Sequence, residues 1–512
     1  MATSGTQVLI VGAGPTGLVL ALGLAARGVR FRIVDKKAGP GEASRAMVVQ
    51  ARTLEFYRQL GFAEAVVAEG IRIERLHIRR HGKEAAAIDI KDIGTGISPY
   101  PFVLGYPQDD HERFLVERLR KLGFEVEWNT ALDSLTQDAH GARATLASGE
   151  TVDIDYLCGC DGARSVVRES LQLGFPGGTY AHMFYVADVK VAGPFQVDLS
   201  MNLDAEGFVL VLPVRSRGVQ RLIGVVPEAL SARDDLAFDD VRVRVEQLSG
   251  VKVEELNWFS SYRVHHRVAD HFRAGRCFVA GDAGHVHSPV GGQGMNTGIG
   301  DAFNLAWKLA DVLAGHADAS LLDTYETERI AFARSLVATT DRAFQNVIGL
   351  GIGSRLLRGW IVPHVMPALV RLKALRRLMF DLVSQVRIEY RDSALSEGSA
   401  GKVHGGDRLP WVDIARDGDN FTPLRSLDWQ VHVYGELQPS LRDECTRHDL
   451  AAHAFPWSPQ AGTAGLQRDA VYLVRPDGYV AWASERQDPT ALVDYLRRKA
   501  LRAYSNGDAC AE

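Results

Sequence analysis

The sequence predicts an α/β protein in which an antiparallel sheet interrupts a Rossmann-type βαβ domain and a small α/β module follows. Three observations predict this fold. A short apolar run, a glycine-rich turn and a helical pattern open the chain, and short alternating stretches fill its middle. A serine- and glycine-rich stretch at 393–406 then separates the C-terminal module.

The composition is that of a globular protein. Of the 512 residues, 46% are hydrophobic and 24% are charged, and 58 Lys and Arg against 63 Asp and Glu give a net charge of -5. This length suggests about three domains. The near-neutral balance argues against a nucleic-acid partner. Five cysteines without a C-x-x-C pair argue against a disulfide scaffold or a metal site, and favour the cytoplasm.

The apolar stretch from Val8 to Ala26 could be read as a signal peptide or a membrane span. Its glycines make a poor membrane helix, and no basic residue precedes it. We therefore expect a soluble, unprocessed chain without a membrane partner.

A dinucleotide-binding pattern lies at the N-terminus. A strand at Gln7–Val11 leads into Gly12, Gly14 and Gly17 of a G-x-G-x-x-G motif, and a second strand ends at Val34. The first glycine permits the tight turn, the second lets a pyrophosphate approach and the third lets the helix pack on the sheet. Pro15 and Thr16 begin the helix, whose free N–H groups attract phosphate. Asp35, followed by Lys36, stands where a carboxylate can bind ribose hydroxyls.

Other elements follow from periodicity. Helices are expected at Thr53–Leu60, Glu112–Leu122 and Asp301–Leu313, and a buried strand is expected at Phe278–Gly281. Antiparallel strands are expected within 71–104 and at Phe184–Val191, Val197–Leu203, Gly207–Val214 and Arg221–Val226. The C-terminal module has expected strands at Gln430–Tyr434, Val471–Val474 and Tyr479–Trp482, and a helix from about Pro489. The basic, apolar segment 345–382 is expected to bridge two domains, with a membrane-surface helix as the alternative.

A second glycine-rich motif runs from Arg276 to Asn296 and contains Gly281-Asp282 and Gly291-Gly-Gln-Gly-Met-Asn296. Here the chain resembles the FAD-dependent aromatic hydroxylases of the para-hydroxybenzoate hydroxylase family. The resemblance implies that Asp282 lies near the ribityl chain and pyrophosphate, and that Pro289 and Gly292 line the flavin ring. A helix from Gly294, which carries Met295 and Asn296, would point its positive N-terminus at the ring.

Three further segments resemble the family. Asp161-Gly162 matches its Asp-Gly motif, Arg45 its cofactor-binding arginine and Gln108 its flavin-side glutamine. Arg113 is a further cofactor candidate, with a surface ion pair as the alternative. The resemblance divides the chain into an FAD-binding domain (1–75, 105–179 and 268–395), a substrate-binding sheet (76–104 and 180–267) and a thioredoxin-like C-terminal domain (400–505).

The resemblance implies an FAD-dependent monooxygenase that uses NADH or NADPH and O2 to hydroxylate a phenolic or polyketide substrate through a C4a-hydroperoxyflavin. Only one dinucleotide motif is present, so the nicotinamide donor would bind transiently. The C-terminal domain lacks a C-x-x-C pair, which favours a structural or homodimer-contact role over a redox one.

Substrate contacts are expected from the antiparallel sheet and the flavin loop, although each candidate could instead be core. The candidates are Tyr185, Met201, Phe208, Leu210, Tyr262 and Pro289. Tyr262, His265 and His266 are candidates for assisting deprotonation, and Arg215 and Arg263 for binding a carboxylate. Two other functions stay open: a flavin halogenase, suggested by Gly359-Trp360-Ile361-Val362-Pro363, and a non-catalytic carrier with the same fold.

Overall fold

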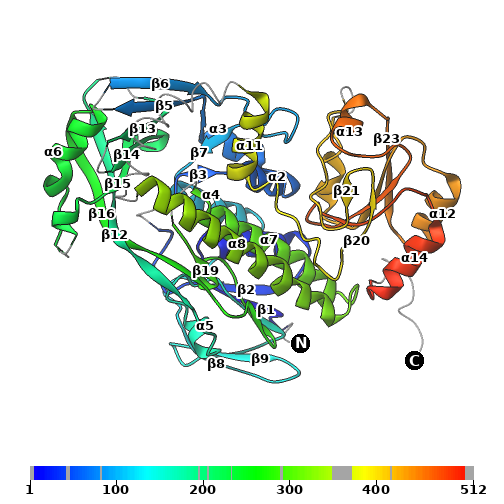
Figure 1. Ribbon diagram of the computed structural model, residues 1–512. Coiled ribbons are helices and arrows are strands. Elements are labelled where there is room, and N and C mark those ends of the chain that lie inside the picture. Colours follow the sequence, from blue (N-terminus) through cyan, green and yellow to red (C-terminus); the bar gives the residue numbers. More distant parts are fainter. Residues whose placement is uncertain are drawn as a thin grey trace.

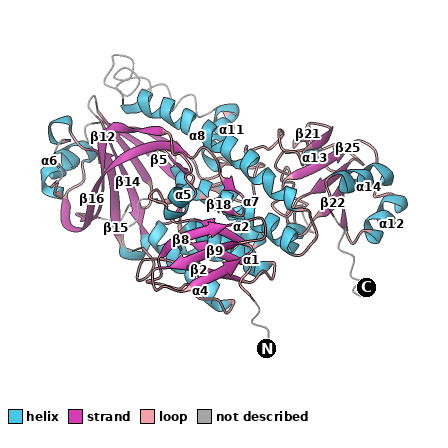
Figure 2. Cartoon of the chain, turned by 90° about the horizontal axis from the view of Figure 1, so that it is seen from below, coloured by secondary structure: helices cyan, strands magenta, loops and turns pink. Residues whose placement is uncertain are grey.

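The computed structural model describes residues 5–41, 46–80, 83–193, 196–204, 207–231, 233, 235–288, 292–348, 372–414 and 418–501. Helices α7 (Gly294–Leu313) and α8 (Asp323–Ile348) run through its middle. Both views place helix α6 (Phe238–Ser249) and the C-terminal domain at opposite ends of the molecule (Figures 1 and 2).

A five-stranded sheet forms the core of the N-terminal domain. Strand β1 (Val8–Val11) lies in its interior and pairs in parallel with β2 (Phe31–Val34) and β11 (Tyr156–Gly159). Strand β18 (Cys277–Val279) pairs in parallel with β11, and β17 (Arg273–Ala274) closes the edge antiparallel to it. Helix α1 (Pro15–Ala26) follows β1 directly, so the predicted βαβ opening is confirmed.

An eight-stranded, mainly antiparallel sheet stands beside this domain, in the order β19-β16-β12-β15-β14-β13-β5-β6. Its strands are β5 (Arg75–Arg80), β6 (Lys83–Asp89), β12 (Gly177–Val191), β13 (Leu199–Leu203), β14 (Phe208–Val214), β15 (Val219–Val225), β16 (Val253–Val268) and β19 (His285–Val286). Helix α6 packs on one face through Phe238, Val241 and Val245. The expected strand Phe184–Val191 is the second half of β12, because β16 pairs with it from Gly177 onward.

Two small sheets and several short helices complete these regions. One sheet joins β3 (Val48–Val49), β7 (Val103–Gly105) and β4 (Ile71–Ile73), and the other joins β8 (Leu132–Gln137), β9 (Ala142–Leu146) and β10 (Thr151–Ile154). The helices are α2 (Ala51–Gln59), α3 (Ala63–Glu69), α4 (Gln108–Lys121), α5 (Val166–Ser170) and α11 (Lys373–Ser384), with 3-10 turns η1 (Arg215–Arg217) and η3 (Gly281–Ala283).

Two helices begin a full turn or more before the residue that apolar periodicity predicts. Helix α4 starts at Gln108 rather than Glu112, because its first turns bury the polar side chains of Asp109 and His111. Helix α7 starts at Gly294, as the resemblance implied, rather than at Asp301. Most of the segment 345–382, with the tryptophan motif at 359–363, lies outside the described residues.

The C-terminal domain has a six-stranded sheet in the order β21-β20-β25-β24-β22-β23. Its strands are β20 (Glu397–Ala400), β21 (Val403–His404), β22 (Gln430–Tyr434), β23 (Ala451–Phe455), β24 (Val471–Val474) and β25 (Val480–Ser484), and its helices are α12 (Pro439–Arg447), α13 (Pro459–Thr463) and α14 (Pro489–Arg498). The strands β22 and β23 are parallel, whereas β24 is antiparallel to β22 and β25. The strands expected at Gln430–Tyr434 and Val471–Val474 are confirmed.

In the described part of the chain, no helix is both long enough and apolar enough to cross a membrane. The domain boundaries given above stay predictions.

Candidate active site

The three glycines of the N-terminal motif meet different surroundings. A Cβ on Gly12, whose φ is +106°, would lie 2.3 Å from the carbonyl oxygen of Cys160, and one on Gly17 would lie 1.9 Å from that of Gly12. A Cβ on Gly14 would meet no atom within 4 Å. The protein's own packing therefore requires Gly12 and Gly17, whereas Gly14 leaves an open backbone surface that fits an approaching pyrophosphate.

The carboxylate of Asp35 binds the backbone of the glycine-rich loop that follows β1. It accepts hydrogen bonds from the N–H of Ala13 at 2.7 Å and the N–H of Lys37 at 2.8 Å. Asp35 is buried and the neighbouring Lys36 is exposed. Each carboxylate oxygen can accept a second bond, so the same group can also bind ribose hydroxyls.

The second glycine-rich motif packs directly on the first. A Cβ on Gly281 would lie 2.5 Å from Thr16 Oγ1, and a Cβ on Gly298 would lie 2.4 Å from the same atom. Thr16 of α1 thus sits between the η3 turn and helix α7. Asp282, next to Gly281, is exposed at this junction. The structure therefore brings together two motifs that are far apart in the sequence.

The Asp-Gly motif joins the same junction. A Cβ on Gly12 would also lie 2.8 Å from the backbone nitrogen of Asp161, which places the Asp161-Gly162 turn against the glycine loop. Burial raises the pKa of the Asp161 carboxyl group, although the N–H of Val167 donates to it at 3.2 Å.

Helix α7 presents its N-terminus without a capping side chain, since Gln293 makes no cap hydrogen bond. The first N–H groups of a helix have no partner within it, and together with the helix dipole they favour negative charge at this end. The fully buried Asn296 accepts from Gln50 N and Thr53 Oγ1 and donates to the carbonyls of Val48 and Gly292. Its side chain therefore ties the loop to α2 and β3, and only its backbone remains for a ligand. Met295 is half-buried beside it, and Pro289 lies outside the described residues.

Two predicted cofactor residues lie on α4. Gln108 donates to Glu112 Oε1 at 2.8 Å, and Glu112 Oε2 accepts from the N–H of Gly41 at 2.8 Å. These bonds anchor the start of the segment that carries Arg45, which is itself outside the described residues. Arg113 pairs with Asp109 and Asp110 and borders a surface hollow of about 590 Å³ between α3 and α4. Its contacts match the surface ion-pair alternative.

Three substrate candidates share one face of the eight-stranded sheet. Met201 and Phe208 are half-buried and pack against the core of the N-terminal domain, and Leu210 packs beside Met47. Met201 and Leu210 are register partners on β13 and β14. Alternation along β15 adds Ile223 to this face, a residue that the sequence analysis missed although the period-2 pattern could have found it.

Tyr185 is not brought to that face. Its ring stacks on Phe259 with centroids 6.3 Å apart, and it belongs to the core beneath α6. This placement matches the core alternative for Tyr185, because strand alternation turns its side chain to the side of the sheet opposite Leu210 and Ile223. Tyr262 lies on the face of the sheet opposite α6, where its ring centroid is 6.0 Å from that of Phe184.

The histidine candidates make contacts typical of strand residues. Thr179 Oγ1 and His265 Nδ1 are hydrogen-bonded at 2.7 Å, and the ring of His266 lies 4.6 Å from that of Tyr180. Burial lowers the pKa of both histidines.

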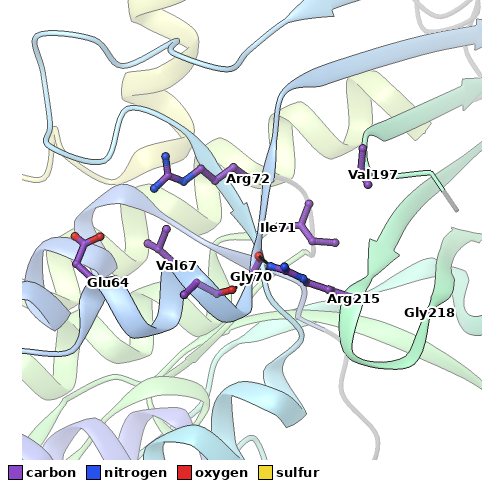
Figure 3. A pocket seen from close by; sticks show the side chains of 9 residues that line it. Glu64, Val67, Gly70, Ile71, Arg72, Val197, Arg215 and Gly218 are labelled. Carbon is purple, nitrogen blue, oxygen red and sulfur yellow. Dashed lines mark hydrogen bonds between the residues drawn. The ribbon is translucent and has the colours of Figure 1, made fainter.

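Backbone carbonyls hold both arginine candidates. Arg263 donates to Ser231 O at 2.7 Å, and Arg215 donates to Ala68 O and Gly70 O, each at 3.0 Å. Arg215 reaches from η1 towards Gly70 across an open surface hollow of about 740 Å³ (Figure 3). Arg221, which belongs to the sheet, forms a buried ion pair with Asp188 at 2.6 Å.

In the ranges that the structure describes, no group of three or more His, Cys, Asp or Glu side chains could hold a metal ion.

Comparison with known proteins agrees with this geometry. Residues 5–340 match the model of an FAD binding domain, and residues 404–502 match that of the aromatic-ring hydroxylase C-terminal domain. The chain belongs to the FAD-dependent aromatic-ring hydroxylases. It is 36% identical to the 6-methylpretetramide 4-monooxygenase of Streptomyces rimosus, over 96% of this chain and 93% of that protein.

Two other relatives extend this result. The pentachlorophenol 4-monooxygenase of Sphingobium chlorophenolicum is 32% identical, over 92% of this chain and 93% of that protein. The crystal structure of aklavinone-11 hydroxylase with FAD and aklavinone superposes with a TM-score of 0.80 at 27% identity, covering 98% of this chain and 100% of that one. The predicted family and FAD-dependent monooxygenase activity are confirmed, and the relatives support hydroxylation over the halogenase and carrier alternatives.

When bound, FAD would supply the redox chemistry of this hydroxylase. The protein binds and orients the cofactor, excludes water and holds the aromatic ring. The open surface at Gly14 and the uncapped end of α7 suit the first task, and the apolar face of β13, β14 and β15 suits the last two.

Proposed function

We propose that this hydroxylase acts on an uncharged, fused-ring phenol of polyketide type, with NADH or NADPH as a transient donor. One observation carries the proposal: Met201, Phe208, Leu210 and Ile223 form a half-buried apolar surface facing the N-terminal domain. Such a surface favours an extended apolar ring system. The names of the polyketide-directed relatives agree with this substrate class.

Arg221 lies on this face of the sheet, and its contacts support a substrate without a carboxylate. Arg221 is paired with Asp188, and Arg215 and Arg263 donate to backbone carbonyls. Freeing the buried Arg221 guanidinium to bind a small benzoate would leave the buried Asp188 carboxylate uncompensated.

The cofactor contacts are proposed as follows. The backbone around Gly14 and the first turn of α1 bind the pyrophosphate, Asp35 binds the adenosine ribose and Asp282 lies beside the ribityl chain. The N-terminus of α7, at Gly294–Asn296, faces the ring and favours the negative charge of its reduced form. The proposed set is completed by Asp161, Gln108, Gly292, Pro289 and Arg45. Arg113 is not included, because it pairs with Asp109 and Asp110.

We infer that the C-terminal domain is a thioredoxin-like module without redox activity. The order β22-α12-β23-α13-β24-β25-α14, with β24 antiparallel to its neighbours, supports this topology. Burial raises the pKa of the Cys445 thiol to about 11, so it is a poor nucleophile. A structural role follows.

The test is oxygen incorporation by the purified holoprotein. Fused-ring phenols, para-hydroxybenzoate and pentachlorophenol are each added with NADH or NADPH under ¹⁸O2, and donor consumption and product mass are measured. The proposal predicts that a fused-ring phenol stimulates donor consumption and that its product carries one labelled oxygen atom. Labelled product from para-hydroxybenzoate or pentachlorophenol alone would overturn the assigned substrate class.

A further inference from the structure

A buried carboxylate joins helix α7 to the turn that carries Asp282. Asp301 is fully buried on α7, two turns beyond its N-terminal residues. Its Oδ2 accepts from the N–H of Gly281 at 2.9 Å and bonds His285 Nε2 at 2.7 Å. Its Oδ1 accepts from Arg329 Nε at 2.6 Å. One side chain thus holds both ends of the Gly281–His285 turn.

The arginine that faces Asp301 is itself fixed. Arg329 of α8 donates to Tyr390 Oη at 2.8 Å and to the carbonyl oxygen of Thr297 at 3.1 Å. Thr297 lies one turn before Asp301 on the same helix. The guanidinium therefore connects α8 to α7 and leaves the carboxylate one orientation.

The turn and the helix approach each other at backbone distance. A Cβ on Gly298 would lie 3.0 Å from the Cα of Gly281, and Gly281 has a φ of +61°. The N–H of Gly281 points into this dry contact. Without Asp301 it would be a buried donor with no acceptor, which is unfavourable.

The protonation state agrees with the geometry. Burial alone would raise the pKa of the Asp301 carboxyl group, but Arg329 and His285 lower it below its usual value. Asp301 therefore carries the negative charge that Arg329 and the two donors of the turn require.

We propose that Asp301 is a positioning residue for cofactor binding, which sets the Gly281–His285 turn against α7 so that Asp282 and the N-terminus of α7 reach the same FAD molecule. Asp301 makes no contact with FAD in this arrangement, because protein atoms bury its side chain completely. The inference rests on the cofactor contacts proposed above. FAD binding is measured without substrate, so the result does not depend on the assigned substrate class.

The test compares Asp301→Asn with Glu328→Gln, a buried carboxylate on α8 that bonds Lys308 and Arg475 rather than the turn. FAD affinity of the apoprotein, its thermal unfolding midpoint and the visible spectrum of the bound flavin are measured. We expect both variants to lower the midpoint. Only Asp301→Asn should weaken FAD binding, by at least about tenfold, which is about 1.4 kcal/mol, and alter the flavin spectrum.

A second variant covers the case in which Asp301→Asn does not fold. His285→Phe removes one bond to Asp301 and leaves no buried charge unpaired, so the apoprotein should fold and bind FAD about threefold or more weakly. Wild-type affinity and spectrum in a folded Asp301→Asn protein, or in His285→Phe, would overturn the proposal. Equal losses of affinity in Asp301→Asn and Glu328→Gln would also overturn it.

Discussion

Arg475 of the C-terminal domain and Glu328 of helix α8 form a two-bond ion pair that solvent does not reach. The bonds are 2.8 and 3.0 Å long and both side chains are fully buried. Burial alone would raise the pKa of the Glu328 carboxyl group, but Arg475 and Lys308 lower it well below its usual value. Arg475 also binds Asp477, whose carboxylate accepts from Trp307 of α7 at 3.1 Å. The C-terminal domain is therefore joined to the helices of the FAD-binding domain by buried charges.

Removing Arg475 should destabilise the whole chain. Arg475→Leu leaves Glu328 and Asp477 buried without their shared partner, so we expect a loss of about 3–5 kcal/mol in the free energy of unfolding. Chemical denaturation followed by circular dichroism measures it. The control is Arg498→Leu, which breaks a solvent-exposed pair with Glu397 and should cost less than about 1 kcal/mol. Equal losses in the two variants would contradict a buried interdomain network.

Substitutions of Gly14 and Gly17 should separate binding from folding. Gly17→Ala places a Cβ against the carbonyl oxygen of Gly12, so poor folding is expected. Gly14→Ala meets no protein atom and should give a folded apoprotein that binds FAD at least about tenfold more weakly. Thermal unfolding of the apoproteins and FAD titration measure the two effects. A Gly14→Ala protein with wild-type FAD affinity would show that the pyrophosphate lies elsewhere.

Two neighbouring residues of β14, Phe208 and Val209, should separate substrate binding from folding, because their side chains lie on opposite faces of the sheet. Phe208→Ala removes a ring from the proposed substrate face and should raise the KM for a fused-ring phenol about tenfold. Val209 points to the core beneath α6, so Val209→Ala should lower the midpoint and leave KM unchanged. Substrate-stimulated NAD(P)H oxidation gives KM. The reverse pattern would place the substrate on the α6 side.

Acid should destabilise the apoprotein partly through His111. Burial lowers the pKa of this histidine from 6.5 to about 3, where it accepts or donates a bond with Tyr57 Oη at 2.7 Å. Above pH 6.5 His111 is neutral in both the folded and the unfolded chain, so the free energy of unfolding keeps its full value. As the pH falls below that value, the unfolded chain takes up a proton that the folded chain does not, so stability decreases by up to about 1.4 kcal/mol per pH unit.

His111→Gln cannot titrate and should flatten the loss of stability with falling pH, as measured by denaturation at successive pH values. His140→Gln, at an exposed site, serves as the control. If the free energy of unfolding falls equally steeply with pH in wild type and His111→Gln, His111 does not contribute to the acid sensitivity.

The βαβ opening could be predicted from the sequence because its signals are local. The strand, the three glycines and Asp35 lie within one short segment, and the structure places them as expected. The family motifs at Asp161 and Gly281 could also be found, since backbone requirements fix their glycines. Their convergence at Thr16 needed the fold.

The buried charges could not be predicted from periodicity. Asp301, Glu328, Arg329 and Arg475 look like surface residues of helices and turns, yet each is fully buried because an opposite charge from a distant segment pairs with it. The start of α4 could not be predicted because its first turns bury the polar side chains of Asp109 and His111. The side of the sheet on which Tyr185 lies could not be predicted, because alternation groups side chains by face without saying which face packs on the N-terminal domain.

The proposed FAD site is tested most directly by titrating the apoprotein with FAD and recording the visible spectrum of the complex. If the Gly14, Asp161 and Gly281 segments converge on one cofactor, each chain should bind a single equivalent of FAD and show a bound-flavin spectrum. Gly14→Ala and Asp301→Asn should each lower the affinity for FAD. Absence of binding, or an equivalent of FAD that both variants bind as the wild type does, would contradict it.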